Sequence, residues 1–208
     1  MEPTGKRYLR AVEVLAVVLA LGGATGCGRS PRARDDKAPA MEEEEARIAP
    51  ATDVTVPDEE LVDQDGHPVR LRELFADHVV AVNFVFTTCA SICSAMTAIF
   101  GRVQRDLGAA MESKVRLVSI SIDPATDTPE KLRAYASRFD RGAGWTFLTG
   151  APERVEAVLR ALGGLAPVKE RHRPITLIGN MAQGRWQRIH GIAPPRRLAS
   201  WIRPMVHE

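Results

Sequence analysis

The residues best suited to chemistry are Cys89 and Cys93, four positions apart in the segment FVFTTCASICSAM, residues 84–96. The segment starts as an apolar run and continues with a helical pattern, which places the pair at the N-terminus of a helix. Unpaired amide N–H groups and the helix dipole there stabilise a thiolate and lower the pKa of a cysteine below its free value of about 8.5. The pair could bind a soft metal, exchange disulfides with a substrate, or form a structural disulfide, although so short a loop gains little stability from closure.

The N-terminus predicts that the protein is exported. Three basic residues within the first ten positions precede the apolar stretch VLAVVLALGGATG, so residues 1–26 read as a signal peptide. About sixteen residues of low polarity are fewer than the ~20 that a spanning helix needs, which makes a permanent transmembrane anchor the second choice. The sequence ATGC resembles a bacterial lipoprotein cleavage box and predicts lipidation of Cys27. Ordinary cleavage and an uncleaved anchor are the alternatives.

If Cys27 is lipidated, Cys89 and Cys93 remain as an isolated pair. Export places this pair in surroundings that usually oxidise thiols. Residues 27–53 are rich in charge, proline and alanine without an apolar period, which predicts a disordered tether. The acidic block Glu42–Glu45 within it is interpreted as solvated charge and not as a metal-collecting patch. One folded domain is expected over residues 54–208. A formal charge of +2 with scattered basic residues gives no indication of a nucleic-acid partner.

The apolar pattern of the expected domain alternates between strands and helices. A hairpin is expected around Asp65-Gly66, because this pair separates two short apolar runs. Further strands are expected over residues 78–86, 115–122, 145–150, 174–180 and 184–191, and helices over residues 71–75, 93–108, 129–139, 152–164 and 194–203. This order predicts an α/β fold of thioredoxin-like arrangement with an added N-terminal β-hairpin. Sites in such sheets lie beyond the carboxyl ends of the strands, where Cys89 is expected.

Three segments of the sequence resemble the Sco/SenC family of membrane-tethered copper chaperones. They are VNFVFTTCASIC, SIDPATDTPEKLRAYASRF and RHRPITLIGNMAQGRWQRIHG, in collinear order within roughly residues 54–203. The resemblance implies a thioredoxin-like fold with an added hairpin. It also implies that Cys89, Cys93 and His172 bind one copper, as Cu(I) or Cu(II).

The resemblance further implies a role in assembling the dinuclear copper centre of cytochrome c oxidase. The implied partners are the copper-bearing subunit of that oxidase, a copper donor or thiol reductant, and a membrane on whose extracytoplasmic side the lipid anchor holds the protein. Such a protein would carry copper and would not turn over a substrate as an enzyme, although a thiol–disulfide reductase activity could accompany copper transfer.

The donor types agree independently with copper. Two thiolates and an imidazole suit Cu(I), and also Cu(II), whereas a structural zinc site normally needs a fourth ligand that is not evident nearby. Ala90 and Ser94 stand where many family members have proline, and Arg173 stands where threonine is common. None of these departures removes a donor atom. Arg173 could repel a cationic copper donor or steer an anionic partner.

Other polar residues near these motifs have less specific expectations. Asp123 could orient an imidazole or a partner group, or it could cap a helix entry. Pro174 could be a cis-proline facing the cysteines or an ordinary trans edge proline. The remaining histidines have no metal-binding context and are interpreted as structural; they are His67, His78, His190 and His207.

The rival function is that of an exported thiol–disulfide oxidoreductase, with Cys89 and Cys93 as nucleophile and resolving thiol. His172 separates the two functions, because dithiol exchange has no obvious need for it. A peroxiredoxin-type peroxidase is disfavoured, since Phe86 stands where that chemistry wants a threonine. A metal-free binding module on the same fold is the third alternative.

Overall fold

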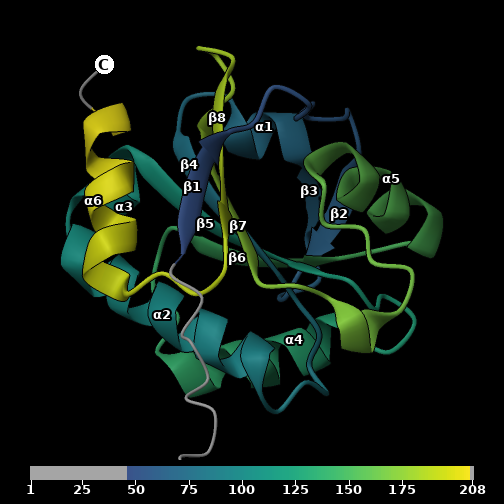
Figure 1. Ribbon diagram of the computed structural model, residues 1–208. Helices are drawn as coiled ribbons and strands as arrows, with labels where there is room; N and C mark the ends of the chain where they lie inside the picture. The colour runs from purple at the N-terminus through teal and green to yellow at the C-terminus, as the bar shows by residue number, and fades with distance from the viewer. Residues whose placement is uncertain (1–45, 207–208) are drawn as a thin grey trace, which may run out of the picture. The chain divides into compact units, whose positions relative to one another are not determined.

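The computed structural model describes residues 46–206, which form one eight-stranded mixed sheet with helices on both faces (Figure 1). The strands are β1 (Arg47–Pro50), β2 (Glu60–Asp63), β3 (Pro68–Arg70), β4 (Val79–Val85), β5 (Val115–Ser121), β6 (Trp145–Thr149), β7 (Ile175–Asn180) and β8 (Arg185–His190). The helices are α1 (Leu71–Phe75), α2 (Ile92–Leu107), α3 (Ala110–Ser113), α4 (Pro129–Ala136), α5 (Pro152–Leu162) and α6 (Pro195–Val206), with short 3₁₀ turns η1 (Ser137–Phe139) and η2 (Lys169–Arg171).

The strand order is β1-β8-β7-β4-β5-β6-β2-β3. Strands β4, β5 and β6 are parallel neighbours, whereas β7 pairs antiparallel with β4 and β8 pairs antiparallel with β7. The hairpin of β2 and β3 joins the sheet through β6 and turns at Asp65-Gly66, where Gly66 has a φ of 86°. A residue with a side chain would be strained in this left-handed region. The thioredoxin-like α/β fold with an N-terminal hairpin is therefore confirmed.

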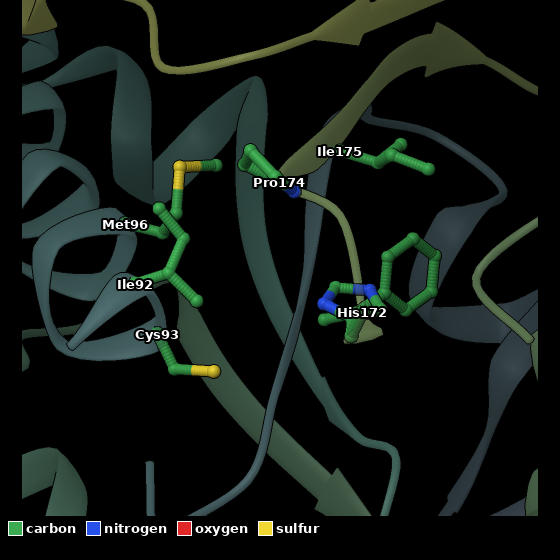
Figure 2. A pocket seen from close by; sticks show the side chains of 7 residues that line it. Ile92, Cys93, Met96, His172, Pro174 and Ile175 are labelled. Carbon is green, nitrogen blue, oxygen red and sulfur yellow. The ribbon is translucent and has the colours of Figure 1, made fainter. Parts of the chain in front are cut away.

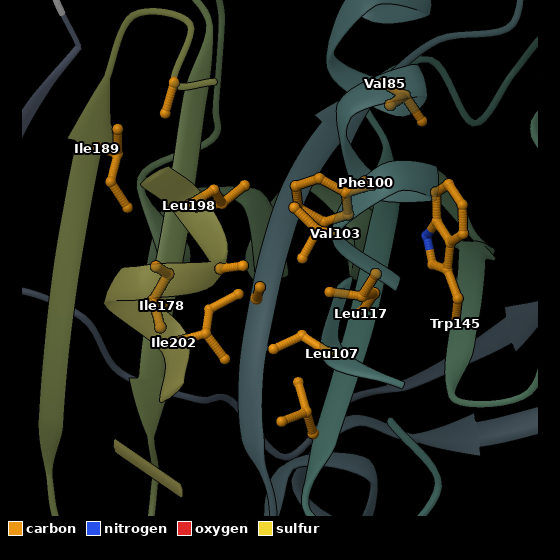
Figure 3. Packing of buried hydrophobic residues seen from close by; sticks show 14 of the residues in the cluster. Val85, Phe100, Val103, Leu107, Leu117, Trp145, Ile178, Ile189, Leu198 and Ile202 are labelled. Atoms are coloured by element: carbon orange, nitrogen blue, oxygen red, sulfur yellow. The ribbon is translucent and has the colours of Figure 1, made fainter. Parts of the chain in front are cut away.

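The central strand β4 is buried on both faces, as its unbroken apolar sequence predicts. Val79, Ala81 and Val85 point into a core shared with α2, α4 and α6, whereas Val80 and Val82 point into a core shared with α1 and α5. Figure 3 shows the first core, with side chains of α2 and α6 packed over the sheet. Because both faces of β4 are covered, the strand is rigid, and its carboxyl end gives the following loop a fixed starting point.

The boundary of the ordered domain differs from the expected one. Residues 27–53 were predicted to form a disordered tether, but Arg47–Pro50 form the edge strand β1 and pair antiparallel with β8. The strand is held mainly by backbone hydrogen bonds, and Ile48 is its only apolar side chain that is even partly buried. It therefore carries no alternating pattern that the sequence could reveal.

The predictions for the signal peptide, for Cys27 and for most of the tether lie outside the described residues. Within residues 46–206, no helix has both the length and the apolar character needed to cross a membrane.

Candidate functional site

The two cysteines lie where β4 passes into α2. Cys89 is in the connecting loop, and its amide donates a hydrogen bond to the Phe86 carbonyl at 3.1 Å. Cys93 is in the first turn of α2 and is only 1% exposed, compared with 9% for Cys89. The Ser94 hydroxyl donates to the Cys89 carbonyl at 3.1 Å, and the Thr97 hydroxyl donates to the Cys93 carbonyl at 2.7 Å. These bonds hold the backbone of both cysteines at the N-terminus of the helix, where the pair was predicted.

The two thiols are free and differ in acidity. Burial raises the pKa of Cys89, but hydrogen bonds from the Cys93 thiol, from the Cys93 amide at 3.4 Å and from Ser91 outweigh burial and lower its pKa below the ordinary value. Burial, followed by the hydrogen bond to Cys89, raises the pKa of Cys93 to about 12. Cys89 is therefore the sulfur that ionises first, and Cys93 keeps its proton until something displaces it.

Iodoacetamide at neutral pH is expected to label Cys89 and spare Cys93, because the thiolate is the reacting form. Mass spectrometry of digested protein would locate the label. With rising pH, labelling of Cys89 should level off earlier than that of an ordinary thiol, whereas Cys93 should stay unreactive until the pH approaches about 12. The unfolded protein, in which the two thiols react alike, is the control. Equal labelling in the folded protein would contradict the assigned asymmetry.

His172 and Cys93 line the same small pocket, which is too tightly packed to admit a water molecule. Figure 2 shows the two side chains facing this pocket from opposite sides, Cys93 from α2 and His172 from the segment before β7. The other lining residues are apolar; they are Phe84, Ile92, Met96, Pro174 and Ile175. The fold thus brings together two predicted ligands that are 79 positions apart in the chain.

The environment of His172 leaves one ring nitrogen without a partner. Its backbone amide closes the turn of η2 by donating to the Lys169 carbonyl at 3.1 Å. Its ring packs edge-on against Phe84 with centroids 6.0 Å apart. Burial lowers the pKa of His172, so the imidazole is neutral at neutral pH. Nε2 is buried and makes no hydrogen bond. A buried polar atom of this kind is costly unless something else binds it.

The three predicted ligands do not all meet at one point. Cys89 does not line the pocket that Cys93 shares with His172. Among residues 46–206, no three side chains of His, Cys, Asp or Glu are grouped closely enough to hold a metal ion. The structure therefore pairs Cys89 with Cys93, and Cys93 with His172, but a three-ligand site would need local movement.

Asp123 holds the segment that carries His172 without contacting the imidazole. Its carboxylate forms an ion pair with the Lys169 ammonium at 2.5 Å, three residues before His172. The same ammonium lies 5.8 Å from the centre of the Phe86 ring, beside the cysteine loop. Burial raises the pKa of Asp123, but hydrogen bonds from Lys169 and Thr126 outweigh burial and lower it. Asp123 therefore ties the segment of Lys169 to the turn before α4 through its bond with Thr126, and the orienting role toward an imidazole or a partner group stays a prediction.

Asp127 directly precedes the cap of α4 but does not cap this helix itself. The cap of α4 is Thr128, whose hydroxyl accepts a hydrogen bond from the Lys131 amide at 3.4 Å. Asp127 is fully buried and instead accepts hydrogen bonds from Thr87 and Ser121. One sign of this role is visible in the sequence: Asp127 directly precedes Thr128, which is itself a good cap, so the aspartate is not needed to cap the helix.

The other histidines that the structure describes do not line this pocket. His67 pairs with Asp63 at 3.5 Å in the hairpin turn, His78 precedes β4, and His190 ends β8. His207 lies outside the described residues. No cis peptide bond occurs in the part of the chain that the structure describes, so Pro174 is trans. Its carbonyl accepts a hydrogen bond from the Gly191 amide at 3.0 Å.

The Gly164→Ala substitution is expected to disturb the histidine side of the pocket. An added Cβ would lie 2.3 Å from the ring of Phe84, which packs against His172. Overpacking of this kind destabilises a protein by roughly 1–3 kcal/mol, which denaturant unfolding would measure. In the matched control, Gly142→Ala, the Cβ would meet only the flexible end of Gln104 at 3.2 Å, and the loss should not exceed about 1 kcal/mol. Equal losses would contradict the steric argument.

The fold and the site together define a class, that of thioredoxin-like proteins with a dithiol at the N-terminus of the helix after the central strand. The SCO1/SenC family model matches residues 49–173, which include both cysteines and His172. The chain belongs to the SCO1/SenC family.

Individual relatives agree with this assignment. The chain is 36% identical over 109 residues to a Stutzerimonas stutzeri protein named as copper-binding, an alignment that covers 52% of each chain. The chain spans about half the length of the curated relatives it matches.

Solved structures of the family share the fold. BsSco, a member of the Sco family of cytochrome c oxidase assembly proteins in which a disulfide switch has been identified, superposes with a TM-score of 0.64 at 25% identity, covering 76% of this chain and 96% of BsSco. Yeast Sco1 with copper bound superposes with a TM-score of 0.62 at 19% identity, covering 74% of this chain and 90% of the yeast chain.

Proposed function

We propose that this protein is a copper chaperone that binds one copper through Cys89, Cys93 and His172. The observation that carries the proposal is the buried, unpartnered Nε2 of His172, which belongs to a neutral imidazole lining the same pocket as Cys93. A soft cation held by thiolates and imidazole would satisfy that nitrogen. The name of the S. stutzeri relative, which describes it as copper-binding, and the copper in the yeast Sco1 structure support copper as the metal.

Each ligand contributes differently to the proposed site. Cys89 ionises first and is the more accessible sulfur, so it makes the first bond to an incoming copper ion. Cys93 binds next and must lose its proton, because only a thiolate is a strong ligand. Copper binding therefore releases protons and strengthens as pH rises. His172 completes the site when its segment moves toward the cysteines.

The incomplete closure of the site suits a carrier that must also release its metal. Three ligands leave an edge of the copper open to a ligand of the acceptor, so that copper passes by ligand exchange. We propose that the acceptor is the copper-bearing subunit of cytochrome c oxidase, since the family relative BsSco belongs to a group of oxidase assembly proteins. Arg171 and Arg173 are exposed on either side of His172 and favour an acceptor with an acidic surface.

The location of the protein is part of the proposal. An exported domain, tethered to the extracytoplasmic side of a membrane by a lipid on Cys27, would meet the extracytoplasmic copper centre of an oxidase subunit. Mass spectrometry of the mature protein would test this, with a lipid-modified N-terminal cysteine as the expected result.

An anaerobic titration of the reduced protein with Cu(I) tests the function. One equivalent should bind, and the copper should then move to the soluble copper-bearing domain of the oxidase subunit when the two proteins are mixed. Copper in the separated proteins would be measured by atomic absorption. A protein that ignores copper but rapidly reduces disulfides would contradict the proposal.

That second outcome would identify a thiol–disulfide oxidoreductase, for which the unequal thiols are the favouring observation. A low pKa at Cys89 suits an attacking nucleophile, and a buried, protonated Cys93 suits a resolving thiol. This function gives no role to His172, so its pocket would be unexplained.

A further inference from the structure

The pocket shared by Cys93 and His172 is bordered by three segments without charged residues, which together form what we call the uncharged rim. The segments are residues 87–95, 163–168 and 191–195. None of them contains Asp, Glu, Lys or Arg, although these residues make up 26% of the chain. Depletion of charge is characteristic of the centre of a protein–protein interface.

All three segments of the uncharged rim adjoin the pocket. The first contributes Cys93 to its lining. In the second, Gly164 lies against Phe84, because a Cβ added to it would be 2.3 Å from the ring. In the third, the Gly191 amide donates a hydrogen bond to the Pro174 carbonyl at 3.0 Å. Phe84 and Pro174 both line the pocket, and Figure 2 shows Pro174 on the side from which His172 comes.

The uncharged rim also carries exposed apolar side chains. Among residues 46–206, only three large apolar side chains are exposed, namely Leu165, Val168 and Ile192, at 43%, 45% and 43%. All three belong to the rim, and Val168 begins the turn η2 that leads to His172. Single exposed apolar residues scattered over a surface need no explanation, but a group confined to the border of one pocket indicates a binding surface.

The charges beside the uncharged rim are mainly basic. Arg171 and Arg173 are exposed, and Glu170 is the only acidic residue within residues 169–173. A partner with acidic groups at the edge of its own apolar surface would be attracted here, whereas a partner with basic groups would be repelled. The charges therefore favour one kind of partner for the apolar surface.

We propose that the uncharged rim is the surface on which the copper acceptor docks. An apolar patch of the acceptor would cover Leu165, Val168 and Ile192, and its acidic groups would lie near Arg171 and Arg173. The inference rests on the proposed function and adds the surface that selects the partner. Ligand exchange brings the ligands of the two proteins within bonding distance, so the border of the pocket must be covered during transfer. An uncharged border avoids the high cost of burying charge.

Copper transfer from the loaded protein to the soluble copper-bearing domain of the oxidase subunit tests this surface. Leu165→Glu and Ile192→Glu should each lower the second-order rate constant of transfer about tenfold, because a carboxylate would be buried against an apolar and acidic partner. Transfer to a small chelator, which needs no docking, should keep its rate. Ala182→Glu is the matched control. It adds the same charge at an exposed position in the turn after β7, whereas Pro174 precedes that strand, and transfer should be unchanged.

Methyl NMR tests docking without copper. When the acceptor domain is added to the metal-free protein, the methyl signals of Leu165, Val168 and Ile192 should shift, and that of Ala182 should stay in place. A rising salt concentration should weaken the shifts, because it screens the attraction between the arginines and an acidic partner. Arg173→Gln should reduce this dependence on salt.

The outcomes separate the docking surface from the proposed function. Methyl shifts in a protein that binds no copper would remove the function and keep the surface. Equally fast transfer from the wild-type protein and both rim variants would overturn the surface and leave the copper site standing. Equal slowing of transfer to the chelator would mean that the substitutions disturb the copper site, and the methyl shifts then decide.

Two further outcomes concern the occupant of the uncharged rim. Methyl shifts that depend on the concentration of the protein alone would assign the rim to a second copy of this chain. Shifts caused by vesicles of anionic phospholipid, and not by the acceptor domain, would assign it to a membrane. Either result overturns the acceptor as the partner.

Discussion

Replacing either cysteine with serine is expected to lower the affinity for copper by more than about 100-fold. Loss of a group that only supports a metal ligand already costs 10- to 100-fold, and a hydroxyl is a far poorer ligand for a soft ion than a thiolate. Cys89→Ser and Cys93→Ser should both fail to retain copper in an anaerobic competition with a chelator of known affinity.

Met96→Leu is the matched control for this prediction, because Met96 is the other sulfur-containing residue that lines the pocket. Leucine has a similar volume and no sulfur, so copper affinity should be unchanged if the thiolates are the sulfur ligands. A loss in Met96→Leu equal to that in Cys89→Ser would show that the donor set is wrong. Full copper binding by both serine variants would show that neither cysteine is a copper ligand.

Replacing His172 with alanine is expected to weaken copper retention at least tenfold, by the same scale of ligand effects. The loss arises because the imidazole is the only predicted nitrogen donor at the pocket of Cys93. His190→Ala is the control, since His190 is exposed at the end of β8 and should leave copper affinity unchanged. Disulfide reduction by the two variants should remain equal. Full copper affinity in His172→Ala, with efficient disulfide reduction, would favour the oxidoreductase.

The free energy of unfolding provides a second test of whether His172 is a metal ligand. In the metal-free protein, the buried Nε2 lacks a hydrogen bond and is surrounded mainly by apolar side chains. His172→Leu should therefore raise the free energy of unfolding by about 1 kcal/mol while removing copper-dependent stabilisation. Thermal unfolding with and without Cu(I) would measure both effects. A large loss of stability in the metal-free variant would mean that His172 is a packing residue and not a ligand held ready.

The chemistry of the cysteine pair could be predicted from local sequence, because every feature that it needs is local. The apolar run of β4, the two cysteines and the periodic pattern of α2 follow each other within residues 79–107. The strand ends where its apolar run ends, and the helix begins beside Cys93. The position of the pair at a helix N-terminus then follows from geometry alone.

The edge strand β1 could not be predicted in this way. It joins the sheet through backbone hydrogen bonds to β8, a partner about 140 positions later, and its side chains carry almost no apolar signal. Backbone groups are the same in every residue except proline, so pairing of this kind leaves little trace in the sequence. The expected boundary at residue 54 was therefore too late.

The sequence by itself determined the α/β order, the family resemblance and the two thiols, because periodicity and spacing are properties of neighbouring residues. Only the tertiary structure decided that Cys93 is the buried thiol, that His172 shares its pocket while Cys89 does not line it, and that Asp127 turns inward beneath the cysteine loop. Those properties depend on burial and on contacts between residues distant in the chain. Both are set by how the layers pack, and a pattern of neighbouring residues does not contain them.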